Sequence, residues 1–180
     1  MPTFKNMLGT PYKREYLGEG DNAIYATVDK ISSIVKESYV NPYVRQWAEH
    51  IVNHISNNNK LAEVAAVHRF VWKHVRYTKD PYGMEYLQTP PHLLKMIEEG
   101  KRPHGDCDDM TMLSLSLLRS IGFPVAVKIA SYQENGKFAH IYGLAYVHGK
   151  GWMPVECVRG DKPLGWQAPG ITRQLEMEVR

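Results

Sequence analysis

The chain has 180 residues and a net charge of +3, with 43% hydrophobic and 23% charged residues. A chain of this size and balance buries its own core, so the composition excludes fibrous, disulfide-rich and disordered proteins. No run approaches the roughly 20 apolar residues of a membrane span, and the N-terminus lacks the apolar segment of a secretory signal. The basic residues are scattered along the chain, which argues against a nucleic-acid partner.

Residues 1–20 are rich in glycine and proline and predict an extended N-terminal arm, followed by a single domain over 21–180. Apolar residues at helical spacing predict four helices, over about 21–40, 42–55, 60–75 and 91–99. Asn41 and Pro42 suit the cap and the first position of the second helix. Trp72, on the third helix, is expected in the core.

A fifth helix is predicted to begin at Asp106 and Cys107 and to end at Ile121, before Gly122. Asp106 suits its N-cap, and Asp109 stands where a side chain can return a bond to the cap. Apolar residues cover so much of this helix that it is expected to be buried.

After Pro124 the apolar period changes from 3.6 to 2, which predicts strands over 125–130, 138–147 and 151–158. Asn135-Gly136 is a strong signal for a tight hairpin turn. The alternating C-terminal tail predicts an edge strand, and Pro154 indicates that the third strand is also at an edge or bulged. Helices followed by an antiparallel meander give an α+β domain.

Three residues form a candidate catalytic set: Cys107 at a helix start, His140 early in one strand and Glu156 late in the next. Helix N-terminal N–H groups favour a thiolate, an imidazole can take its proton, and a carboxylate can orient the imidazole. His140 and Glu156 are separated by an even number of residues, which predicts one shared sheet face. A hairpin loop centred on His148 would place them directly opposite each other.

Other interpretations of these residues remain open. An isolated cysteine is most often a small buried hydrophobe, and Cys157 is expected to be a packing thiol of this kind. Asp108 and Asp109 would repel a thiolate if they pointed toward it. His104, Cys107, Asp108 and Asp109 are four potential ligands within six residues that rarely converge on one ion, so we predict neither a metal nor a cofactor.

Three sequence boxes resemble those of the transglutaminase-like superfamily, which has a papain-like cysteine fold. Gly105-Asp106-Cys107-Asp108-Asp109, followed by a leucine-rich helix and Gly122-Phe123-Pro124, resembles its Cys box. Phe138-Ala139-His140-Ile141-Tyr142 resembles its His box, and Gly151-Trp152-Met153-Pro154-Val155-Glu156 resembles its third box. The resemblance covers about residues 60–160, and it departs from the family in having Glu156 where an aspartate is usual.

The resemblance implies acyl transfer through a thioester on Cys107, with His140 as the proton shuttle and Glu156 orienting it. Gln88 is a candidate for an additional oxyanion donor, because an amide N–H suits a developing negative charge. A single-domain chain of this size resembles bacterial and bacteriophage members, which favours hydrolysis of a protein or peptide and a cytoplasmic or virion-associated location. A crosslinking transglutaminase, and a non-enzymatic virion or assembly protein that binds a phage or bacterial partner through this fold, are the alternatives.

Overall fold

The computed structural model describes residues 4–5, 11–12, 20–56, 59–80, 86–134 and 136–180. The predicted extended arm lies mostly outside these residues. Two short pieces of it are described, β1 (Phe4–Lys5) and β2 (Pro11–Tyr12), and they pair with each other in antiparallel fashion. Among the described helices, none is long and apolar enough to cross a membrane.

Five helices precede the main sheet, as the sequence predicts: α1 (Gly20–Tyr39), α2 (Pro42–Val52), α3 (Lys60–His74), α4 (Pro90–Glu98) and α5 (Cys107–Ser120). Asn41 caps α2 by accepting a hydrogen bond from the Tyr43 N–H, and Pro42 occupies the first helical position. The second helix ends earlier than predicted, at Val52. Trp72 is 42% exposed, so its prediction as a core residue is wrong.

The main sheet has four antiparallel strands in the order β7-β6-β5-β8. Its strands are β5 (Val125–Ser131), β6 (His140–Val147), β7 (Gly151–Val155) and β8 (Arg173–Glu178). The predicted meander and C-terminal edge strand are therefore present, and Pro154 lies in an edge strand as expected. A two-stranded parallel sheet was not predicted: β3 (Arg76–Tyr77) pairs with β4 (His104–Gly105).

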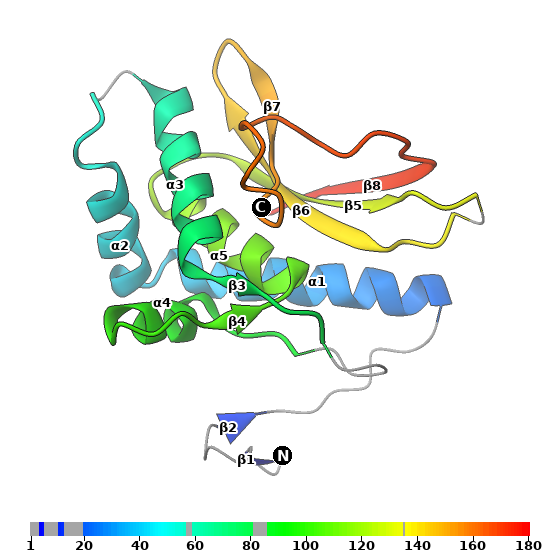
Figure 1. Ribbon diagram of the computed structural model, residues 1–180, viewed down its shortest axis with the longest axis horizontal. Helices are drawn as coiled ribbons and strands as arrows, with labels where there is room; N and C mark the ends of the chain where they lie inside the picture. Colours follow the sequence, from blue (N-terminus) through cyan, green and yellow to red (C-terminus); the bar gives the residue numbers. More distant parts are fainter. Residues whose placement is uncertain (1–3, 6–10, 13–19, 57–58, 81–85, 135) are drawn as a thin grey trace.

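Helix α5 occupies the centre of the molecule (Figure 1), where it contacts the other four helices and the sheet strands β5 and β6. Most of its side chains are buried, from Asp108 to Leu118. At Gly143 of β6, a Cβ atom would lie 2.6 Å from Leu115 Cδ2, so the absence of a side chain lets the strand approach the helix closely. This packing fixes the start of α5 relative to β6.

Candidate active site

His140 and Glu156 are in direct contact. His140 is the first residue of β6, Glu156 follows the last residue of β7, and His140 Nε2 lies 2.5 Å from Glu156 Oε2. The predicted shared face is confirmed, but the directly opposed register is wrong. Gly143 pairs with Val155, so the loop is centred on Gly149 and the two side chains meet diagonally. The longer glutamate side chain spans this diagonal, and its use in place of aspartate fits the register.

The contact with Glu156 uses one ring nitrogen of His140 and leaves the other nitrogen for proton transfer. Glu156 is 3% exposed, and its Oε1 accepts a hydrogen bond from the Val158 N–H at 3.1 Å, which fixes the carboxylate. Because Nε2 of His140 is bonded to Glu156, Nδ1 is the ring nitrogen left to exchange a proton with a reacting group. The Tyr142 ring, with its centroid 5.7 Å from that of His140, supports the imidazole on the same sheet face.

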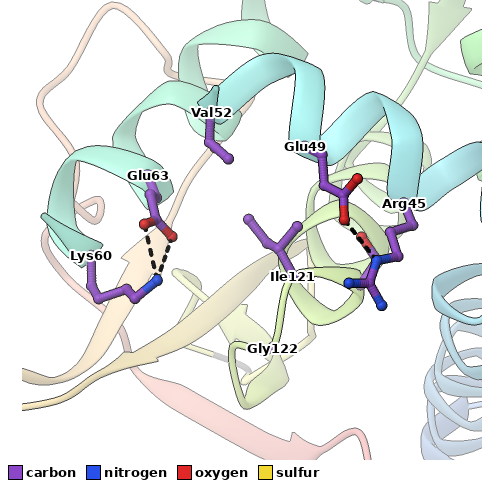
Figure 2. A pocket seen from close by; sticks show the side chains of 8 residues that line it. Arg45, Glu49, Val52, Lys60, Glu63, Ile121 and Gly122 are labelled. Carbon is purple, nitrogen blue, oxygen red and sulfur yellow. Dashed lines mark hydrogen bonds and ion pairs between the residues drawn. The ribbon is translucent and has the colours of Figure 1, made fainter. Parts of the chain in front are cut away.

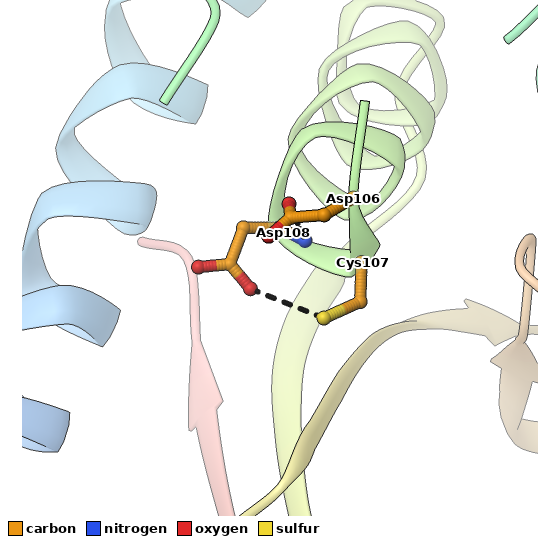
Figure 3. Close-up of side chains that lie close together, drawn as sticks. All are labelled: Asp106, Cys107 and Asp108. Atoms are coloured by element: carbon orange, nitrogen blue, oxygen red, sulfur yellow. Dashed lines mark hydrogen bonds between the residues drawn. The ribbon is translucent and has the colours of Figure 1, made fainter. Parts of the chain in front are cut away.

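Cys107 is the first residue of α5, and Asp106 caps this helix as predicted. The Asp106 carboxylate accepts hydrogen bonds from the N–H groups of Asp108 and Asp109, at 3.0 and 3.4 Å. The thiol turns toward Asp108, with Sγ 3.5 Å from its Oδ1 (Figure 3). Burial, followed by the charges of Asp108 and Asp106, raises the pKa of the thiol, so the resting thiol is protonated.

The thiol also lies beside the strand that carries His140. Hydrogen bonding with the backbone of Ile141, the residue after His140, partly offsets the raised pKa of Cys107. One turn along α5, Thr111 Oγ1 donates to the Ile141 carbonyl at 3.4 Å. Among the described residues, Cys107 Sγ bonds to Asp108 and His140 Nε2 bonds to Glu156, and the two side chains are not hydrogen-bonded to each other. The thiol must therefore turn away from Asp108 to share its proton with the imidazole.

Buried Asp109 and partly buried Gln88 form a separate hydrogen-bonded pair. Gln88 donates to Asp109 through its backbone N–H at 2.7 Å and through Nε2 at 2.8 Å. The same Nε2 donates to the His104 carbonyl at 2.7 Å, so both amide hydrogens have partners. An oxyanion role for Gln88 would require one of these bonds to break. Asp109 thus holds the segment at Gln88 against α5, instead of returning a bond to the cap.

Tyr77 is a candidate hydrogen-bond donor of the site that the sequence did not single out. It pairs with Gly105 in the β3–β4 sheet, two residues before Cys107, and is 40% exposed. Burial is the main cause that raises the pKa of its hydroxyl, followed by electrostatic interactions with Cys107, Asp106, Asp108 and Glu156, in decreasing order. Tyr77 therefore carries a protonated hydroxyl donor near the thiol. Strands of two residues are too short to show an alternating pattern in the sequence, so only the structure identifies this pairing.

His104, Cys107, Asp108 and Asp109, the four potential metal ligands considered from the sequence, do not all meet in the structure. Ligand atoms of Asp106, Cys107 and Asp108 lie within 4.8 Å of one another, whereas Asp109 faces Gln88 and His104 Nδ1 contacts Thr78 Oγ1. Two carboxylates and a thiol are a mixed donor set that suits neither a hard nor a soft cation well.

A surface hollow of about 410 Å³ lies at the other end of α5 (Figure 2). Its charged side chains are paired with each other: Arg45 with Glu49 at 2.8 Å and Lys60 with Glu63 at 2.9 Å. It is lined in part by Ser120 and Gly122, whereas Cys107 begins the helix, roughly 20 Å away for a helix of this length. The hollow is therefore not part of the site around the thiol.

Comparisons with known proteins agree with the sequence boxes. The family model described as the Transglutaminase-like superfamily matches residues 45–157. Sequence comparison with curated proteins finds no significant match.

Solved structures with a similar fold include a proposed cysteine protease from Cytophaga hutchinsonii, with a TM-score of 0.54 and 18% identity over 83% of this chain and 46% of that one. Another is a proposed protease from Parabacteroides distasonis, with a TM-score of 0.52 and 14% identity over 69% of this chain and 25% of that one. Calcium-bound LapG from Legionella pneumophila has a TM-score of 0.51 and 17% identity over 81% of this chain and 80% of its own. The chain spans less than half the length of the first two proteins, and at these identities the similarity shows the fold.

Asp109 provides a pH-dependent test of its hydrogen-bonded pair with Gln88. Burial raises its pKa to about 7 despite the two hydrogen bonds from Gln88, while an unfolded aspartate has a pKa of about 3.9. The folded state therefore binds an extra proton between these values, and this contribution to stability is lost as pH rises through about 7. Asp109→Asn does not titrate, so we expect its free energy of unfolding, relative to wild type, to increase by about 2 kcal/mol between pH 5.5 and pH 8.

Urea unfolding at the two pH values measures this difference. Asp161→Asn is the matched control, because Asp161 is exposed and the hydrogen bond from Arg159 lowers its pKa below the tested range. A constant difference between Asp109→Asn and wild type would show that Asp109 stays ionised in the folded protein.

Proposed function

Because the chain belongs to the transglutaminase-like superfamily, we propose that it is a cysteine-dependent hydrolase that cleaves amide bonds of a protein or peptide through a thioester on Cys107. The observation that carries this proposal is the 2.5 Å contact between His140 Nε2 and Glu156 Oε2, at the start of the strand that borders the thiol. A buried carboxylate that holds an imidazole by one nitrogen leaves the other nitrogen available as a base.

The proposed reaction begins when the thiol leaves Asp108 and its proton passes to His140 Nδ1. Cys107 Sγ then attacks the carbonyl carbon of the substrate, and the carbonyl π electrons move to the oxygen. When the oxyanion collapses, the carbon–nitrogen bond breaks and the leaving amine takes the proton from His140. Water then attacks the thioester carbon while His140 accepts its proton. When the second oxyanion collapses, the carbon–sulfur bond breaks, the carboxylic acid product leaves, and the sulfur takes the proton back from His140.

Two donors near the thiol are proposed to stabilise the oxyanion. The first is the N–H of Cys107, which is at the first position of α5 and has no partner within the helix. The second is the hydroxyl of Tyr77, whose backbone pairs with Gly105, two residues before Cys107, and whose pKa responds to the charge of Cys107. A fixed donor of this kind contributes most when negative charge develops on the substrate oxygen.

The same acyl-enzyme intermediate would give crosslinking if an amine replaced water, and no contact of the described site selects an amine. Hydrolysis is the proposed outcome because similar solved structures bear the names of proteases. A non-enzymatic role in a bacterial or phage assembly remains the competing prediction from the sequence. The cytoplasmic or virion-associated location is likewise a proposal that the sequence alone supports.

Hydrolysis can be measured with a fluorescein-labelled denatured protein as a general substrate. We expect wild type to release labelled peptides, Cys107→Ala and His140→Asn to release none, and Glu156→Gln to lower kcat at least about a hundredfold. Ser120→Ala is the control, because Ser120 lies at the opposite end of α5 from Cys107 and its hydroxyl donates to the Leu117 carbonyl of the same helix. Its activity should stay near that of wild type.

The assay includes a labelled primary amine, and it is run with calcium and with EGTA because LapG was solved in a calcium-bound form. Incorporation of the amine into protein would show a transglutaminase. A folded wild type that neither cleaves nor crosslinks, or cleavage that persists in Cys107→Ala, would contradict the proposed reaction.

The Tyr77 hydroxyl is tested by Tyr77→Phe, which removes the donor and keeps the ring. Loss of one oxyanion donor lowers kcat by about a hundredfold in other enzymes, and we expect a decrease of this order with KM little changed. Tyr86→Phe is the control, since Tyr86 is an exposed tyrosine in the following segment. A kcat for Tyr77→Phe within twofold of the control would exclude the hydroxyl from the reaction.

A further inference from the structure

We propose that His68 and Trp72, one turn apart on α3, form a clamp that positions the backbone of residues 156–160 and thereby holds Glu156 against His140. We call these two residues the α3 clamp. The inference rests on the proposed function, because it identifies what positions the acid of the catalytic pair. His68 and Trp72 are positioning residues in this account, acting through Glu156.

A clamp is needed because the pairing of β6 with β7 stops before it reaches Glu156. Pairing between β6 and β7 ends at Gly143 and Val155, one residue before Glu156. The ladder of backbone hydrogen bonds therefore does not hold the residue whose side chain must meet His140. Some other element must fix its backbone, because a small displacement of an orienting group is enough to impair catalysis.

His68 supplies the first contact. It is 3% exposed, and its Nε2 lies 2.9 Å from the backbone oxygen of Glu156. A carbonyl oxygen only accepts hydrogen bonds, so Nε2 of His68 must carry the hydrogen. Burial lowers the pKa of His68, which favours the neutral ring. The imidazole thus fixes the peptide plane from which the Glu156 side chain projects.

Trp72 supplies the second contact, four residues later on the same helix face. A Cβ atom on Gly160 would lie only 2.2 Å from Trp72 Cγ and 2.3 Å from Trp72 Cβ. The backbone at Gly160 therefore packs directly on the indole, at a distance that only glycine permits. This contact explains why Trp72 is outside the core: part of its ring covers the 156–160 segment, and the rest is exposed.

The two contacts bracket the segment that carries the acid. Glu156 is then held at its backbone oxygen by His68, at Oε1 by the Val158 N–H and at Oε2 by His140 Nε2. These partners come from α3, from the segment itself and from β6. His68 therefore holds the backbone of Glu156, and the other two partners hold its carboxylate.

His68→Leu removes the donor, and His68→Gln replaces it with an amide that can place a donor at the same position. His74→Leu is the matched control, because His74 Nδ1 lies 2.8 Å from the Phe70 backbone oxygen and is therefore bonded within its own helix. Gly160→Ala is a second perturbation that leaves His68 intact and displaces the indole. Thermal unfolding of each variant establishes that it is folded.

The main readout is the downfield imidazole N–H proton signal of His140 in NMR spectra, assigned by its loss in Glu156→Gln. We expect His68→Leu to lose or strongly broaden this signal and to lower kcat about tenfold or more with little change in KM. His68→Gln should restore both, His74→Leu should retain both, and Gly160→Ala should weaken the signal.

The clamp is overturned if folded His68→Leu and Gly160→Ala keep the His140 signal and kcat within twofold of His74→Leu. The NMR readout needs no turnover, so the two proposals can fail separately. A wild-type protein that shows the signal but has no Cys107-dependent activity would overturn the proposed function, and the signal in His68→Leu would still decide whether the clamp exists.

Discussion

The short hydrogen bond between His140 and Glu156 is the interaction on which the proposed chemistry depends. It joins the first residue of β6 to the residue that follows β7, and it uses the Nε2 atom of the imidazole. The later steps of the proposed reaction depend on this use of Nε2, because only Nδ1 remains to accept the proton of a nucleophile. The sheet brings the two strands together, but it stops one residue short of Glu156, and contacts from α3 complete the arrangement.

The electrostatics of the thiol oppose its activation in the resting state. Asp106 and Asp108 lie beside Cys107, and with burial they raise the pKa of the thiol. A helix N-terminus alone would favour the thiolate, so here the neighbouring carboxylates and desolvation are the larger effects. The proposed reaction would therefore depend on transfer of the proton to His140 when the thiol turns from Asp108, and not on a thiolate that is present beforehand.

Much of the fold could be predicted from the sequence, and the failures have identifiable causes. Period and capping residues gave the helices and the meander, and the even separation of His140 and Glu156 gave their shared face. The register differed because Gly149 and Gly151 both adopt positive φ, and a pattern of glycines does not show where the loop is centred. His68 and Trp72 were missed for another reason: their partners lie far along the chain, and helical periodicity shows only which face is apolar.

The most direct test of the account is the rate at which iodoacetamide modifies each of the two thiols, followed by mass spectrometry near neutral pH in wild type and in His140→Asn. Cys157 is buried and serves as an internal reference. We expect Cys107 to react at least about tenfold faster than Cys157, and this advantage to fall sharply when His140 is replaced, because the thiolate forms by proton transfer to the imidazole. Equal slow labelling of both thiols, or a Cys107 rate that His140→Asn does not change, would contradict it.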